Sequence, residues 1–116
     1  MLDKVTEASL LFDFYGNLLT EKQRRVMSLY HEENLSLGEI AEEDNVSRQA
    51  VHISLKKAEK ALNEYEDKLS LVKRWQDNLK LIENIASEIR SIDTSELKEE
   101  DRVTMMRILD EIGRID

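Results

Sequence analysis

The sequence predicts an all-α protein, and two observations carry this prediction. Its 116 residues contain no proline and only three glycines, at positions 16, 38 and 113, so little in the composition interrupts a helix. No stretch alternates apolar and polar residues for long, as a half-buried strand would. Within this class we expect a helix-turn-helix bundle followed by a long C-terminal helical extension.

Capping signals place the first two helices. The apolar spacing predicts a helix over residues 2–15 that ends near Gly16. Thr20 followed by Gln23 forms a capping box, which predicts a second helix that begins there and reaches about His31.

The same signals predict the helix-turn-helix itself. Ser36 and Glu39 form a second capping box, and the short helix that they begin ends at Asn45, a residue that tolerates the left-handed conformation. Val46 is expected to fill the corner, and Ser47 caps the next helix. Two helices joined by such a turn place the second one in the major groove of DNA.

The helix from Ser47 carries apolar residues at alternating steps of four and three, a heptad pattern. The first series is Val51, Leu55, Ala58, Leu62, Tyr65, Leu69 and Val72, and the second is Val72, Trp75, Leu79, Ile82, Ala86 and Ile89. Two successive steps of three at their junction fit either one continuous helix or a break near Ser70. Thr94 or Ser95 is expected to cap a final helix.

These patterns divide the chain into two parts. Residues 1–66 form the N-terminal helix and the helix-turn-helix module, and residues 67–116 form a C-terminal extension that packs on the first part or on a second copy. The heptad series exceeds what one small core needs, which predicts a homodimer through the C-terminal helices.

Charge is unevenly distributed along the chain. The formal net charge is −8, yet residues 47–62 carry four bases against one acid. Residues 36–46 carry four acids and no base, which form either a solvated face or a surface that repels DNA and meets protein. If all four bases touched phosphate, the log–log salt slope would be only about −3.6 per protomer, so useful affinity requires a dimer or a partner.

The candidate DNA contacts lie on and beside that basic helix. Arg48 can read a guanine and Gln49 an adenine by bidentate hydrogen bonds, and His52 lies one turn further on. Backbone N–H groups at helix starts and lysine side chains are the phosphate candidates: Ser36, Ser47, Lys56, Lys57 and Lys60. Ile53 shares the exposed side. The alternative is that all of these are ordinary surface residues.

Other functional classes lack support in the residues. Without cysteine there is no disulfide or thiolate metal site, and two isolated histidines make no metal cluster. No nucleophile–base set or phosphate-cradling glycine loop occurs, so we expect no enzyme activity and no cofactor. No run approaches the ~18–20 apolar residues of a membrane span, and the start has no signal-peptide pattern, so a cytoplasmic protein without a membrane partner is expected.

The residues also resemble known families. The stretch LTEKQRRVMSLYHEENLSLGEIAEEDNVSRQAVHISLKKAEKAL, residues 19–62, is similar to region 4 of sigma factors, especially the extracytoplasmic-function type. With LFDFYGNLLTEKQ before it and EYEDKLSLV after it, the chain more closely resembles the YlxM-like helix-turn-helix proteins of bacteria. The core-binding region 2 of sigma factors is absent, so a true sigma factor is not expected.

The YlxM resemblance implies a DNA-binding regulatory protein with a part in the signal recognition particle pathway, because genes of that family commonly neighbour the gene of the particle's GTPase. The alternative is a protein-binding accessory factor of that GTPase or its RNA. Such a factor would use the acidic C-terminal helices and need no sequence-specific DNA binding.

Overall fold

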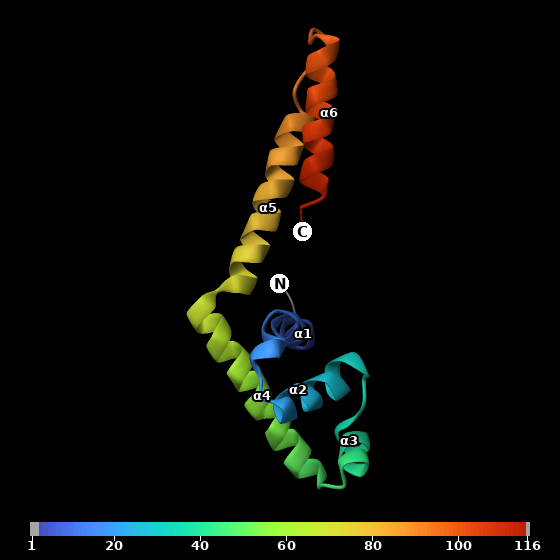
Figure 1. Ribbon diagram of the computed structural model, residues 1–116, viewed down its shortest axis with the longest axis vertical. Helices are drawn as coiled ribbons and strands as arrows, with labels where there is room; N and C mark the ends of the chain where they lie inside the picture. The colour runs from blue at the N-terminus through green and yellow to red at the C-terminus, as the bar shows by residue number, and fades with distance from the viewer. Residues whose placement is uncertain (1–2, 116) are drawn as a thin grey trace. The chain divides into compact units, whose positions relative to one another are not determined.

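The computed structural model describes residues 3–115, and every regular element in that range is helical. The predicted all-α class is therefore confirmed. The helices are α1 (Lys4–Tyr15), α2 (Glu21–Met27), α3 (Leu37–Asp44), α4 (Arg48–Leu69), α5 (Leu71–Arg90) and α6 (Glu99–Gly113), with a 3₁₀ turn η1 (Gly16–Leu18) and a π-helical turn η2 (Ser28–Glu32) (Figure 1). The chain forms two compact units that meet after Val72. The division predicted after residue 66 stays a prediction.

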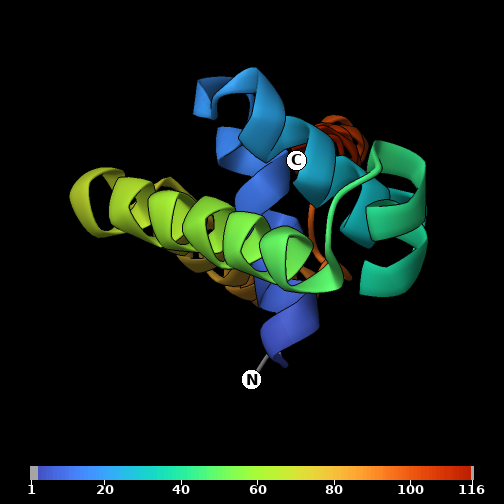
Figure 2. The ribbon, with the colours of Figure 1, turned by 90° about the horizontal axis from the view of Figure 1, so that it is seen from below.

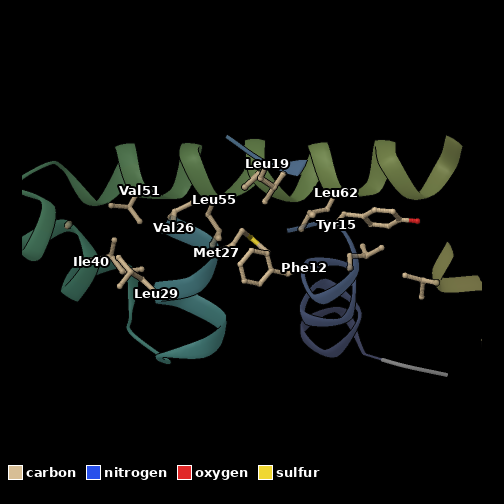
Figure 3. Packing of buried hydrophobic residues seen from close by; sticks show 14 residues of the cluster. Phe12, Tyr15, Leu19, Val26, Met27, Leu29, Ile40, Val51, Leu55 and Leu62 are labelled. Atoms are coloured by element: carbon tan, nitrogen blue, oxygen red, sulfur yellow. The ribbon is translucent and has the colours of Figure 1, made fainter. Parts of the chain in front are cut away.

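The first unit is built around α4. The helices α1, α2 and α3 each pack against it (Figure 2), and together with one face of α4 they form a shared core. Figure 3 shows Val51, Leu55 and Leu62 extending from the same side of α4 toward Ile40, Met27 and Tyr15. Tyr15, Met27, Ile40 and Leu62 are the largest side chains that are fully buried in the described residues. The heptad series of α4 is thus the core of this unit as far as Leu62.

The predicted caps are present. The Oγ1 of Thr20 accepts the Gln23 N–H at 3.2 Å, and the Gln23 side chain accepts the Thr20 N–H at 3.1 Å. Ser36 and Glu39 exchange the same pair of bonds at 3.1 and 3.0 Å. Satisfying these otherwise unpaired N–H groups fixes where each helix starts.

The start of α3 and the start of α4 differ in one respect. The Oγ of Ser47 accepts the Ala50 N–H at 3.0 Å, and alanine cannot return a bond to the cap. Asp3, which the sequence patterns did not single out, caps α1 by accepting the Thr6 N–H at 2.8 Å.

The corner of the helix-turn-helix corrects one expectation. Asn45 is left-handed as predicted, with φ of 55°. Val46, however, does not fill the corner, because 48% of its surface is exposed. Its backbone N–H donates to the Ala41 carbonyl at 3.0 Å to close the turn, which leaves the side chain outside. The interior of the corner is filled by Ile40 and Val51 instead.

The second helix reaches beyond the predicted His31 but changes its winding. After Met27 it continues as the π-helical turn η2, in which the Glu33 N–H donates to the Ser28 carbonyl at 3.0 Å. Such a turn inserts an extra residue and rotates the side chains that follow. It leaves Leu29 buried and His31 half-buried.

The long heptad series is interrupted at Ser70, which settles the alternative that the sequence left open. Ser70 is left-handed, with φ of 54°, and it ends α4. The hydroxyl of buried Tyr15 donates to Glu66 at 2.5 Å and accepts the Leu71 N–H at 3.0 Å, while Glu66 also accepts the Val72 N–H at 3.1 Å. These bonds satisfy backbone groups freed by the break.

The second unit, from Lys73 on, is a helical hairpin in which α6 doubles back along α5 (Figure 1). Its heptad positions are mostly half-buried, and Ala86 alone among its described residues is buried. The cap predicted at Thr94 or Ser95 is wrong: α6 begins at Glu99, after Lys98, because residues 93–98 form turns. Asp93 there accepts the Ser95 N–H at 3.0 Å in a local turn.

Candidate nucleic-acid interface

The α3–turn–α4 segment has the geometry of a helix-turn-helix. Ala41 is buried at the point where α3 and α4 meet, and its small side chain allows the close approach. The left-handed Asn45 reverses the chain, and Ser47 starts α4 two residues later. In this motif the second helix presents the side opposite to its core to DNA.

Helical geometry defines that outward side of α4. At about 100° per residue, the buried residues Val51, Leu55 and Leu62 share one direction. Among residues 48–60 of α4, five exposed residues lie within about 60° of the opposite direction, and we call them the outward face: Gln49, Ile53, Lys56, Lys57 and Lys60. The outward face therefore holds three cations, one amide and one apolar side chain, and the exposed acids Glu64 and Asp67 lie in the same direction further along α4.

The three base-edge candidates are all exposed but do not share one direction. Gln49 belongs to the outward face, whereas His52 lies about 90° to one side of its centre and Arg48 further round. Arg48 is the first residue of α4 and directly follows the capping Ser47. Whether they contact bases stays a prediction.

The phosphate candidates differ in whether they already have a partner within the protein. The Lys56 ammonium lies 3.5 Å from Glu59, a loose pair on a largely exposed side chain. The Ser36 N–H already donates to the Glu39 carboxylate, which therefore occupies the place of a phosphate at the start of α3. Ser47 has no returning carboxylate, so the start of α4 suits an anion better than the start of α3.

Two of the acidic side chains of α3 form hydrogen bonds within the protein. The Arg25 guanidinium holds Asp44 with two hydrogen bonds, 2.7 and 3.4 Å, and joins α2 to α3. This bond to Arg25 lowers the pKa of Asp44, and the same bond raises the pKa of Arg25. Bonds from Ser36 lower the pKa of Glu39 in its capping box. Two of the four acids before α4 thus have a structural partner, Glu39 at the start of α3 and Asp44 beside the turn.

A second polar pair lies at the edge of the core. His31 of η2 and Glu59 of α4 each have a buried side-chain atom, Nε2 and Oε1, without a hydrogen-bond partner. Burial lowers the pKa of His31, and the charge of Glu59 acts in the opposite direction. The imidazole is therefore a proton-sensitive group in the first unit.

Sequence patterns missed Arg25 and gave Ile53 no role. The Arg25–Asp44 pair spans 19 positions, and no local pattern connects residues so far apart. The helical phase of Ile53 could have revealed its outward position, because a residue two positions from Val51 lies roughly opposite the core.

Residues 3–115 offer neither a candidate metal site nor a candidate membrane span. No group of three His, Asp or Glu residues there is placed to hold a metal ion. None of the helices in this range has the length and apolar character of a membrane span.

Comparisons with known proteins agree with this geometry. Residues 2–102 match the family model UPF0122, described as "Putative helix-turn-helix protein, YlxM / p13 like". A UPF0122 protein of Bacillus mycoides is 45% identical over 118 residues, which cover the whole of both chains. A UPF0122 protein of Halalkalibacterium halodurans is 49% identical over 83% of this chain and 88% of its own. One from Bacillus thuringiensis is 56% identical over 71% of this chain and 74% of its own.

Proposed function

Because the chain belongs to the UPF0122 family of YlxM- and p13-like helix-turn-helix proteins, we propose that it is a DNA-binding regulatory protein that reads double-stranded DNA with α4. One observation carries this proposal: three lysines and a glutamine lie on the outward face of the second helix of the motif. Lysines suit phosphates, and glutamine suits the edge of adenine. A cytoplasmic location and a non-enzymatic role belong to the same proposal.

The proposed contacts fall into two groups. Arg48, Gln49 and His52 meet base edges near the start of α4, where side chains of a recognition helix reach furthest into the groove. Lys56, Lys57 and Lys60 meet phosphates further along, together with the backbone of Ser47.

A second copy strengthens the proposal. Four bases per protomer give only modest affinity, so two protomers on adjacent half-sites are needed for tight binding. The second unit leaves several large apolar side chains exposed: Leu81, Ile85, Ile92, Val103, Met106, Ile108 and Ile115. We assign the homodimer contact to this unit. Sedimentation equilibrium at tens of micromolar should give a dimer, and a monomer there would contradict the assignment.

Selection from random duplexes at low salt tests the DNA proposal. It should enrich a defined site, and Lys56→Ala should reduce the salt slope on that site by about one. Arg48→Ala should instead relax the sequence preference at one base pair. Lys68→Ala is the matched control, since Lys68 lies in the last turn of α4. Enrichment of no sequence would contradict the proposal.

The exposed apolar residues of the second unit also favour a second candidate function, that of a protein-binding accessory factor in the signal recognition particle pathway. Pull-down from lysate with and without nuclease separates the two. Capture of the particle's GTPase or RNA that survives Lys56→Ala but is lost on deleting residues 73–116 would favour the accessory factor.

A further inference from the structure

One residue of the outward face has an apolar side chain, which phosphate binding does not explain. Ile53 is 47% exposed, although it lies in the second turn of a long helix whose inner face is well packed. It is directly opposite the buried stripe that contains Val51 and Leu55, so no repacking within α4 could cover it. Apart from Leu69 in the last turn, every other exposed position of α4 is polar or charged.

The surroundings of Ile53 are those expected for a base contact. Gln49 lies one turn earlier on the same face, and Lys56 and Lys57 lie one turn later. Ile53 is therefore placed between the amide suited to adenine and the cations suited to phosphate. This position is close enough to the start of α4 to enter a groove that its first turns occupy.

The major groove offers an apolar side chain one specific partner. Of the four bases only thymine presents a methyl group there, at carbon 5, while the other edges present hydrogen-bond donors and acceptors. The side chain of isoleucine has no polar atom that could bond to those edges. If it were buried against another base, the hydrogen-bonding groups of that base would lose their contact with water and stay unpaired.

We propose that Ile53 contacts the 5-methyl group of a thymine and makes α4 selective for a site that contains A·T pairs read by Gln49 and Ile53 together. This inference rests on the proposed DNA-binding function and deepens it. It assigns Ile53 the role of a specificity-determining residue rather than an affinity-determining one.

Replacement of thymine by deoxyuridine tests this contact, because it removes the methyl group and leaves every hydrogen-bonding group of the base pair unchanged. The full-length protein is titrated with its selected duplex and with versions in which each thymine is replaced in turn. At one thymine per half-site the dissociation constant should rise roughly fourfold, the value expected for one buried methyl group. Other replacements should have no effect.

The Ile53→Ala variant completes the cycle. It should bind the thymine duplex at least as weakly as the wild type binds the deoxyuridine duplex, and it should no longer distinguish the two. Leu69→Ala, which also removes an exposed apolar side chain from α4, is the control and should retain the discrimination. Since Ile53 is exposed, circular dichroism should show that the variant folds normally.

The possible outcomes distinguish failure of the Ile53 contact from failure of the proposed DNA-binding function. A duplex that binds but tolerates deoxyuridine at every position, or an Ile53→Ala variant that still prefers thymine, would overturn the Ile53 contact alone. If no duplex is selected at all, the DNA-binding function fails and the Ile53 contact fails with it. Equal weakening of both duplexes by Ile53→Ala, with discrimination kept, would mean that Ile53 acts elsewhere.

Discussion

The two units use their apolar residues in opposite ways. In the first unit, α1, α2 and α3 surround the inner face of α4, and Tyr15, Met27 and Leu62 are fully buried. In the second unit, the hairpin of α5 and α6 buries only Ala86 among its described residues and leaves Leu81 and Met106 exposed. The same heptad spacing thus makes a core in one unit and a largely open surface in the other. Periodicity specifies a face, and the number of neighbouring helices decides whether that face is covered.

Matched leucine truncations should give the largest difference between the units. Leu62→Ala should reduce the free energy of unfolding of the first unit by about 3 kcal/mol, because it leaves a cavity in a closed core. Leu79→Ala in half-buried α5 should cost about 1 kcal/mol, because less surface returns to water.

Two probes can follow these truncations in urea. Trp75 is the only tryptophan and lies in α5, so its fluorescence reports on the second unit. The near-ultraviolet circular dichroism of the tyrosines, all of which precede residue 66, reports on the first unit. Equal losses for the two variants would mean that the second unit has a core as closed as that of the first.

Two of the three left-handed residues, Asn45 and Ser70, end α3 and α4 and allow the turns there to be tested. Asn45→Ala should destabilise the first unit by about 1 kcal/mol, since alanine is strained at a φ of 55°. Ser70→Gly should stabilise the protein by several tenths of a kcal/mol, because glycine adopts a φ of 54° without strain. Thermal unfolding checks both, with Asn45→Gly as the control that should cost little. A stable Asn45→Ala variant would show that the turn can rearrange.

Protonation of His31 should produce the smallest change in stability, and this change should be confined to the first unit. Burial lowers the pKa of His31, so the unfolded chain binds a proton at a higher pH than the folded chain does. Stability should therefore fall as the pH drops through about 6.5, and the loss should level off below the pKa of the folded state. The melting temperature of His31→Gln should lack this step, whereas exposed His52→Gln should keep it. An unchanged step in His31→Gln would exclude the imidazole as its source.

Much of the fold could be predicted because its signals are local. The capping boxes at Thr20 and Ser36, the left-handed Asn45 and the apolar steps of α4 each involve residues within one or two turns. The errors arose where tertiary contacts or competing turns decide the outcome. Val46 is exposed because its backbone closes the turn, and α6 begins later than the Thr94–Ser95 pair because turns occupy residues 93–98.

The candidate interface was predictable in residue type but not in arrangement. Sequence spacing identified Arg48, Gln49 and His52, and the structure shows that they lie in different directions around α4. The Arg25–Asp44 ion pair, which joins two helices, has no local signature. The packing of α4 also shows Ile53 at the centre of the outward face, a position to which composition alone assigns no chemistry.

We expect α4 of the first unit, and not the second unit, to contact nucleic acid. Amide chemical shifts of the isotopically labelled protein, recorded during titration with its selected duplex, can distinguish the two units. The largest shifts are expected at residues 47–57, with little change in residues 73–115 beyond what dimer formation produces without DNA. Shifts confined to α5 and α6, or no shift at residues 47–57 in a saturated complex, would contradict it.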